Sequence, residues 1–199
     1  MKTHQIDNIL SQDPYVGPMF LGVFPRDKLS LFGDGALVIN TDPSTKPGEH
    51  WIAVFIKNGS AEYFDSYGSD PPKWLKKYWK NVMWTSNPVP LQSPLSAVCG
   101  QYCVYYLLHK ARGYDMNSLL LNFTDDVDFN DQMVHDFIAE RYNLEDLKLI
   151  DTNGIISQLA RALLRYCKSL TADLREALSH LLLRTRESLE RCTLCDSFE

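Results

Sequence analysis

The sequence has neither a long apolar run nor an excess of positive charge. Residues 1–7 lack the apolar core of a secretory signal, and the longest central apolar run, residues 51–56, has the length of a strand and is too short to cross a bilayer. A formal net charge of −5 argues against a surface built mainly for nucleic acid. These absences predict a soluble, non-secreted protein with no membrane segment and no nucleic-acid partner.

Cysteine is unevenly placed. The first 98 residues contain none, and the odd number, five, does not suit a disulfide framework. A reducing compartment fits this pattern better, and there a free thiol can serve as a nucleophile. We therefore expect an intracellular location, nuclear or cytoplasmic. The cysteines are Cys99, Cys103, Cys167, Cys192 and Cys195.

The chain is long enough for one domain with a small appendage. It has 199 residues, of which 45% are hydrophobic, enough for a sizeable core. Near residue 144 the texture changes, and apolar residues repeat at helical spacing over 155–167 and again over 170–182. We expect a globular domain over 1–143 and a helical hairpin in an extension over 144–199, which either docks on the domain or offers an interaction surface.

Alternation of short apolar runs and turn formers predicts a small, antiparallel-rich sheet. Strands are expected over 35–41, 50–57 and 61–64, with a tight turn at Asn58-Gly59. Residues 17–22 are expected as a turn and a short apolar piece.

Three helices are expected around this sheet, which makes the fold class α+β. They cover residues 73–83, 99–112 and 130–142; Ser96 is placed to cap the second helix and Gly113 to end it. The apolar residues expected to face inward in the first and third helices are Leu75, Trp79, Met133, Val134, Phe137 and Ile138.

Four polar residues have the types that thiol-based hydrolysis requires. Cys99 is expected at a helix N-terminus, where backbone N–H groups and the helix dipole favour a thiolate. His50 begins a predicted strand and could act as base, while Asp65 ends the paired strand and could fix the imidazole tautomer. Gln92 lies seven residues before the cysteine, and its amide could join the Cys99 N–H in an oxyanion hole.

The order and wording of these motifs resemble the adenovirus protease family. The resemblance rests on His50-Trp51, Asp65 within residues 63–68, Gln92, and the run 96–100 that ends in Cys-Gly. It covers about residues 13–142 and is closest in wording to the protease-like proteins of Maverick/Polinton elements and adintovirus-type genomes.

The resemblance implies a papain-like, adenain-type fold shared with SUMO and NEDD8 proteases, with the nucleophile at a helix N-terminus. Carried over, Cys99 is the nucleophile, His50 the base and Asp65 the orienting acid; Gln92 and Cys99 form the oxyanion hole, and Trp51 and Gly100 line the substrate groove. The family cleaves peptide bonds next to glycine in virion precursor proteins or in ubiquitin-like tails. For this chain, packaging in virions is an expected alternative to a nuclear or cytoplasmic location.

Two features of that family's activation are not expected here. No cysteine lies between Asp65 and Cys99, so a peptide activator joined by a disulfide at that place has no partner. The net charge of −5 differs from the basic adenovirus enzyme, which uses DNA as a cofactor. We therefore expect no cofactor. The acid also differs: the adenovirus enzyme has glutamate at this position, whereas Asp65 matches the aspartate of the SUMO-protease branch.

Three hypotheses follow for function. The first is a cysteine endopeptidase that processes precursor proteins of a virus or virus-like element. The second is a SUMO or ubiquitin-like-protein protease. The third is an inactive, element-derived protein that acts through its helical extension as an interaction module.

Other motifs favour structural interpretations. The CxxC at 192–195 has no second ligand pair, and the acidic run 125–131 lacks the glycine and glutamate of a calcium loop, so no metal is expected. The basic and aromatic residues of 73–80 favour an amphipathic helix over a nucleic-acid site. Cys103, one turn after Cys99, is expected to face the core.

Overall fold

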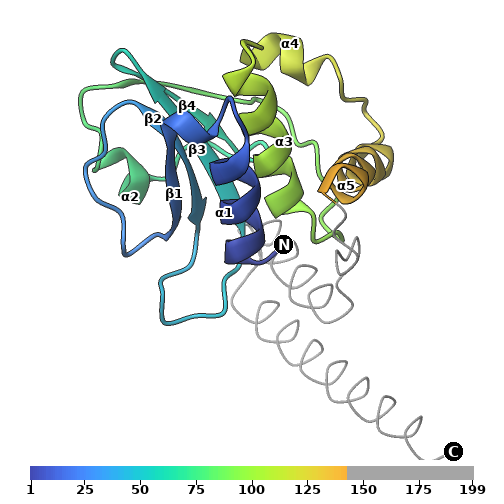
Figure 1. Ribbon diagram of the computed structural model, residues 1–199, viewed down its shortest axis with the longest axis horizontal. Helices are drawn as coiled ribbons and strands as arrows, with labels where there is room; N and C mark the ends of the chain where they lie inside the picture. The colour runs from blue at the N-terminus through green and yellow to red at the C-terminus, as the bar shows by residue number, and fades with distance from the viewer. Residues whose placement is uncertain (143–199) are drawn as a thin grey trace, which may run out of the picture. The chain divides into compact units, whose positions relative to one another are not determined.

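The computed structural model describes residues 1–142 (Figure 1). The predicted boundary at residue 143 and the predicted helical extension over 144–199 lie outside the described residues. No helix among residues 1–142 has both the length and the apolarity that a membrane crossing needs.

A five-stranded sheet forms the centre of the described fold. Its strands lie in chain order: β1 (Phe20–Pro25), β2 (Gly35–Asn40), β3 (Trp51–Lys57), β4 (Ser60–Phe64) and β5 (Met83–Ser86). The pairs β2–β3 and β3–β4 are antiparallel, which confirms the predicted three-stranded core. The two edge strands, β1 and β5, were not predicted, and both pair in parallel with their neighbours.

The interior strand β2 is buried along its whole length because both faces of the sheet are covered. Ala36 and Val38 belong to the core under α1 (Thr3–Gln12) and α3 (Cys99–Ala111), while Leu37 and Ile39 belong to a second core on the opposite face. The sequence of a strand buried on both faces is a continuous apolar run and does not alternate between apolar and polar residues. The figure shows α1 and α3 on one side of the sheet and α2 on the other (Figure 1).

A tight hairpin joins β3 to β4 where Asn58-Gly59 predicted it. Asn58 has φ 51° and Gly59 has φ 76°, so both central residues are left-handed, as the type I′ turn requires. The register pairs Lys57 with Ser60 and Ala53 with Phe64. The residues just before β3 and just after β4 are therefore brought to the same end of the strands.

The predicted helix over 73–83 is wrong beyond its first turn. Helix α2 covers only Lys73–Lys76, and the chain then runs on into strand β5. Leu75 and Trp79 are buried as expected, and the Trp79 indole N–H donates to the Phe32 carbonyl oxygen at 3.0 Å. Residues 77–82 form turns and a bend, and pairing with β4 holds residues 83–86 in extended conformation.

Helix α3 begins at Cys99 as predicted, but Ser96 does not cap it. The N-cap residue is Val98, and no side chain within residues 1–142 caps the helix. The Ser96 hydroxyl instead donates to the Ser93 carbonyl oxygen at 3.2 Å. Gly113, with φ 94°, follows the end of the helix as expected.

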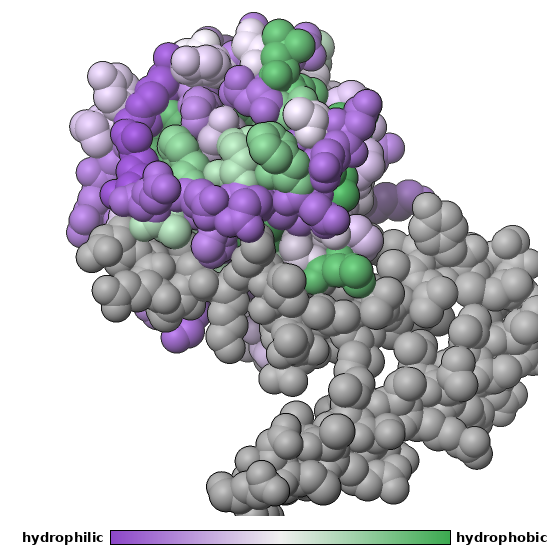
Figure 2. Space-filling model, turned by 90° about the vertical axis from the view of Figure 1, so that its right-hand side faces the viewer, coloured by the Kyte–Doolittle hydropathy of each residue, from purple (hydrophilic) through white to green (hydrophobic). Residues whose placement is uncertain are grey.

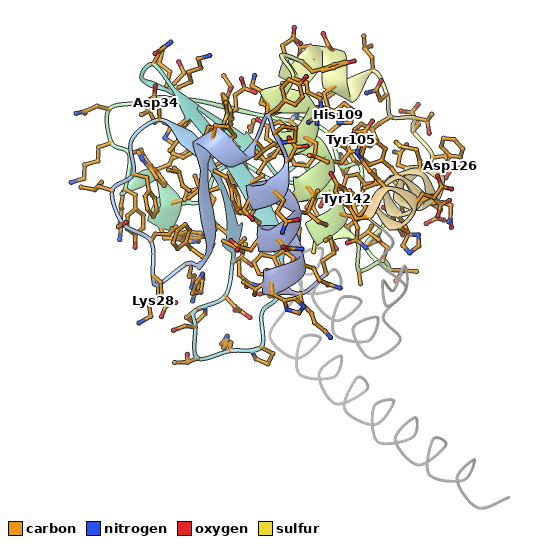
Figure 3. All side chains as sticks on the ribbon, viewed as in Figure 1. Lys28, Asp34, Tyr105, His109, Asp126 and Tyr142 are labelled. Atoms are coloured by element: carbon orange, nitrogen blue, oxygen red, sulfur yellow. The ribbon has the colours of Figure 1, made fainter. Side chains whose placement is uncertain are left out.

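The last described helix, α5 (Val127–Tyr142), begins three residues earlier than predicted. The Asp126 carboxylate accepts from the backbone N–H groups of Asp128 and Phe129, so Asp126 caps the helix. Tyr105 and His109 of α3 face α5 (Figure 3), and their rings lie 5.0 and 5.7 Å from that of Phe137.

Two further features complete the described fold. Helices α1 and α4 (Met116–Leu120) were not predicted. Of the four residues expected to face inward from α5, Val134 and Ile138 are buried, whereas Met133 and Phe137 are half-buried against the same core. The face that carries α4 and α5 has an apolar area framed by hydrophilic residues (Figure 2).

Candidate active site

The β3–β4 hairpin brings His50 and Asp65 together at the open end of its two strands. His50 directly precedes β3 and Asp65 directly follows β4. The His50 Nε2 and the Asp65 Oδ1 lie 2.7 Å apart, and both residues are buried. The carboxylate therefore accepts a hydrogen bond from the protonated Nε2, and the Nδ1 of the imidazole is left for another partner.

The Asp65 carboxylate is held by several donors besides His50. The backbone N–H of Tyr67 donates to its Oδ1 at 2.9 Å, and the hydroxyl of Tyr63 donates to its Oδ2 at 3.3 Å. The Asn87 side chain bonds both the N–H and the carbonyl of Asp65, at 2.9 and 2.7 Å. These contacts leave the acid little freedom to turn away from the imidazole.

An aromatic ring fixes the plane of the imidazole. The Tyr67 ring stacks on that of His50, with centroids 4.7 Å apart and an angle of 27° between the planes. Stacking on one face and hydrogen bonding at Nε2 together determine the direction of the remaining ring nitrogen.

Cys99 is the first residue of α3 and is half-buried. Because no described side chain caps this helix, its first N–H groups are available for an anion. The Cys99 sulfur also accepts a hydrogen bond from the backbone N–H of Trp51, the residue after His50. The helix start and the start of β3 therefore meet at the sulfur.

The charges of this cluster support one another. Burial raises the pKa of the Cys99 thiol, but the hydrogen bond and charge of the His50 imidazolium and the Trp51 N–H lower it below its ordinary value. Burial lowers the pKa of His50, whereas its bond and charge interaction with Asp65, and then with Cys99, raise it to about 10. The arrangement favours a thiolate–imidazolium pair across neutral pH.

The Asp65 carboxyl remains charged within this cluster. Burial raises its pKa, and the hydrogen bond and charge of His50 bring that pKa below the ordinary value. Cys103, one turn along α3, is buried, and burial followed by the nearby Cys99 and Asp65 charges raises its pKa well above that of a free thiol. Only one of the two described thiols therefore has the environment of a nucleophile.

Gln92 is buried in the loop before α3, but its amide is engaged within that loop. Its Oε1 accepts from the Ser66 hydroxyl at 2.6 Å, and its Nε2 donates to the Ser96 carbonyl and hydroxyl at 3.1 and 3.0 Å. An N–H of Gln92 must leave Ser96 to reach an oxyanion. Catalytic hydrogen bonds often form only in the reacting complex, so these contacts do not exclude the role. Gln92 as oxyanion donor therefore stays a prediction.

The two residues expected to line the substrate groove lie next to Cys99. The Trp51 indole N–H donates to the Met1 carbonyl oxygen at 3.3 Å. Gly100 is buried, and a Cβ at this position would lie 3.0 Å from the Met1 Cβ and 3.2 Å from both Ile6 and Trp51. Gly100 therefore allows α1 and β3 to approach the start of α3, and its role in binding substrate stays a prediction.

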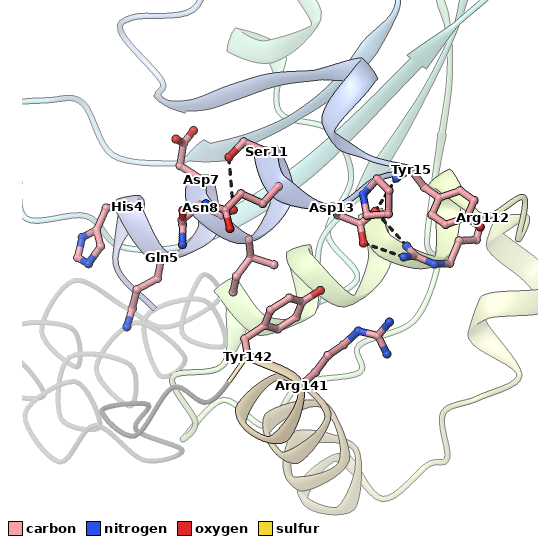
Figure 4. A pocket seen from close by; sticks show the side chains of 13 residues that line it. His4, Gln5, Asp7, Asn8, Ser11, Asp13, Tyr15, Arg112, Arg141 and Tyr142 are labelled. Atoms are coloured by element: carbon pink, nitrogen blue, oxygen red, sulfur yellow. Dashed lines mark hydrogen bonds and ion pairs between the residues drawn. The ribbon is translucent and has the colours of Figure 1, made fainter.

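A large open pocket of the described chain lies away from this cluster, between α1 and the C-terminal end of α5 (Figure 4). The Arg112 guanidinium bonds Asp13 beside it, with an Nη2–Oδ2 distance of 2.7 Å. None of His50, Asp65 and Cys99 lines this pocket. Among residues 1–142 no group of three or more histidines, cysteines or acids is arranged to hold a metal.

Several supporting residues were not identified from the sequence. Tyr67 lies inside the motif around Asp65, and an aromatic residue two positions after the acid was the only available signal. Asn87 and Met1 reach the site only through the folded chain, and no spacing pointed to either residue.

Viral proteases are found among similar proteins. A cysteine protease of African swine fever virus is 31% identical over 85 residues, which cover 35% of this chain and 31% of that protein. A thiol protease of Acanthamoeba polyphaga mimivirus is 27% identical over 101 residues, with 44% of this chain and 33% of that protein covered. The protease of bovine adenovirus C serotype 10 is 32% identical over 114 residues, which cover 46% of this chain and 57% of that protein.

These similarities confirm the expected resemblance to viral cysteine proteases, the adenovirus protease among them. The chain spans about a third of the length of the African swine fever virus proteases that it matches. No family model matches the chain. A crystal structure of the African swine fever virus protease aligns with a TM-score of 0.48 at 16% identity, covering 67% of this chain and 66% of that one. The α+β class itself follows from the sheet and helices described above.

Proposed function

We propose that this chain is a cysteine endopeptidase whose nucleophile is Cys99. The observation that carries the proposal is the chain of contacts from a buried carboxylate, through the Nε2 of His50, to a thiol at an uncapped helix N-terminus. An imidazolium beside a thiol lowers the pKa of that thiol, which is typical of a nucleophile and not of a structural cysteine. The resemblance to viral cysteine proteases supports the same chemistry.

The reaction begins from the thiolate–imidazolium pair. The Cys99 sulfur attacks the carbonyl carbon of the scissile peptide bond, and the carbonyl oxygen becomes an oxyanion next to the free N–H groups of the α3 N-terminus. His50 then donates its Nδ1 proton to the leaving nitrogen, the C–N bond breaks and the amine departs. A thioester joins the acyl group to Cys99.

Water completes the cycle. The now neutral His50 Nδ1 removes a proton from a water molecule that attacks the thioester carbon. The carbon–sulfur bond breaks, the carboxylic product leaves, and the thiolate–imidazolium pair is restored. Asp65 keeps its charge throughout and holds Nε2–H, so that Nδ1 exchanges the proton in both half-reactions.

For substrate, we propose peptide bonds next to glycine in precursor proteins of a virus or virus-like element. Support comes from the resemblance of residues 13–142 to the adenovirus protease family. A second candidate is removal of a ubiquitin-like modifier, because some of the African swine fever virus relatives carry the name SUMO-1 cysteine protease. Parallel assays on Gly-Gly-X peptides and on SUMO or ubiquitin adducts separate the two. A preference for an adduct contradicts the precursor proposal.

Thiol labelling tests the nucleophile before any substrate is known. Iodoacetamide should modify Cys99 much faster than Cys103 at neutral pH, and His50→Ala should remove most of this difference. Equal labelling of the two thiols in the native chain would refute an activated Cys99 and would favour the inactive, element-derived protein. The Cys99→Ala variant should have no peptidase activity, and full activity in His50→Ala would refute the assignment.

A further inference from the structure

The loop that carries Gln92 is anchored to two helices by one buried acid. Asp131 of α5 accepts the backbone N–H of Ser93 through its Oδ2 at 3.1 Å. Its Oδ1 accepts from the Tyr102 hydroxyl of α3 at 2.9 Å. The same hydroxyl lies 2.8 Å from the Leu91 carbonyl oxygen. Asp131 therefore holds Ser93 directly, and Leu91 lies against the Tyr102 hydroxyl that Asp131 binds, so both neighbours of Gln92 contact this pair.

These anchors lie in the interior of the fold. Asp131 is 3% exposed, Tyr102 is fully buried, and Gln92 between the anchored residues is 1% exposed. A buried carboxylate is costly unless donors satisfy it, and here a backbone N–H and a phenol do so. Burial raises the pKa of Asp131 to about 6 despite the hydrogen bonds from Tyr102 and Ser93, so the carboxylate is charged at neutral pH.

The anchor reaches the nucleophile through α3. Tyr102 follows Cys99 by three residues on the same helix, which is close to one turn. A loop fixed to Tyr102 is therefore fixed relative to the sulfur. Neighbouring Asn130 adds a contact from its Nδ2 to the Leu91 carbonyl oxygen at 3.3 Å, which leaves the Tyr102 hydroxyl free to donate to Asp131.

We propose that Asp131 is a positioning residue, which acts through Tyr102 and Ser93 to hold Gln92 at the correct place for the oxyanion. This inference rests on the proposed peptidase function and extends it to a residue on α5 that touches no reacting atom. We call the contacts of Asp131 with Tyr102 and Ser93 the clamp. The clamp matters for turnover because Gln92 must release Ser96 and turn while the rest of the loop stays in place. A displacement of about 1 Å at such a position can cost roughly 100-fold in rate.

The first test compares turnover with thiol reactivity in Asp131→Asn. We expect kcat to fall by about 10- to 100-fold while KM stays within about twofold, because the loss falls on transition-state stabilisation. The alkylation rate of Cys99 by iodoacetamide should not change, because alkylation uses no oxyanion hole. The exposed Glu140 lies on the same helix, and Glu140→Gln should change neither rate. An unchanged kcat, or a parallel fall in alkylation, overturns the proposal.

A double variant tests whether Asp131 acts through Gln92. If it does, Gln92→Ala combined with Asp131→Asn should lose no more kcat than Gln92→Ala alone. Losses that multiply show that the acid acts elsewhere and overturn the clamp. Should Asp131→Asn fail to fold, Tyr102→Phe removes only the hydroxyl and should reduce kcat by roughly 3- to 10-fold with unchanged alkylation, in line with one neutral hydrogen bond.

Amide exchange separates failure of the clamp from failure of the proposed function. Asp131→Asn should speed hydrogen exchange at the Ser93 amide by at least about tenfold, and Glu140→Gln should not. Unchanged exchange at Ser93 overturns the clamp whatever the activity. A native chain with a reactive Cys99 that hydrolyses no peptide refutes the peptidase, and with it the catalytic part of this inference, even where Ser93 exchange responds.

Discussion

Replacing the Asp65 carboxylate with an amide tests the electrostatic coupling at the site. In Asp65→Asn the Oδ1 can still accept from the His50 Nε2, and the new N–H₂ faces the Tyr63 hydroxyl, which can accept a hydrogen bond. The shape and most contacts are therefore kept, and only the charge is removed. Any change in pH dependence then reports the charge.

The magnitude follows from the pKa of His50. Asp65 is the largest influence that raises this pKa, which reaches about 10 in the native chain. A hydrogen bond to a charged group contributes about 1.5–3 kcal/mol, and one pKa unit corresponds to about 1.36 kcal/mol. The substitution should therefore lower the pKa of His50 by about one to two units.

The sign of the pH effect follows from which form of His50 works. Amine departure needs the imidazolium, which is present below the pKa of His50 and is lost as pH rises through it. In the native chain the alkaline limb of kcat/KM should therefore lie near the pKa of about 10, and Asp65→Asn should move it to about 8–9.

The assay is hydrolysis of a fluorogenic peptide between about pH 6 and pH 10.5, with kcat/KM taken at each pH. Asp70→Asn is the matched control, because it removes one exposed acid from the same loop. An alkaline limb that stays in place in Asp65→Asn would show that the carboxylate does not set the pKa of His50, and it would refute the coupling described here. A shift of the same size in Asp70→Asn would reduce the effect to general surface charge.

Three further substitutions test individual parts of the structure. Gln92→Ala should lower kcat by about 10²–10³ with little change in Cys99 alkylation, measured by steady-state and labelling kinetics, and a small effect would exclude an oxyanion donor here. Gln101 is fully buried and both polar atoms of its side chain lack a partner within residues 1–142, so Gln101→Met should raise the free energy of unfolding by about 1–3 kcal/mol in a denaturant titration; destabilisation would reveal a partner for this amide. Gly100→Ala should destabilise the fold by about 1–3 kcal/mol, since the added methyl lies 3.0 Å from the Met1 Cβ; in the same titration, a neutral result would mean that α1 moves aside easily.

The central hairpin could be predicted because its signals are local. Asn58-Gly59 has one well-favoured turn conformation, and apolar runs on both sides can bury both faces of a sheet. The helix start at Cys99 was also recognisable, although the expected cap at Ser96 was wrong. The Ser96 hydroxyl serves the Gln92 loop instead, and sequence spacing does not distinguish these two partners.

Pairing between strands explains why the two edge strands were missed. Residues 83–86 form β5 because β4 offers an edge for parallel pairing. The strands of a parallel pair cannot be joined by a tight turn, so no local turn motif predicts their pairing. Strand β1, which pairs with β2 in parallel, was missed for the same reason.

By itself the sequence determined the chemistry available to this protein: a thiol expected at a helix start, an imidazole and a carboxylate at the two ends of one hairpin, and a glutamine before the thiol. Residue types and local turns suffice for that much. Only the tertiary structure decided which imidazole nitrogen faces the acid, that Tyr67 stacks on the ring, and that Asp131 of α5 holds the loop of Gln92. Those contacts join segments distant in the chain, and their geometry is set by packing, which no spacing in the sequence records.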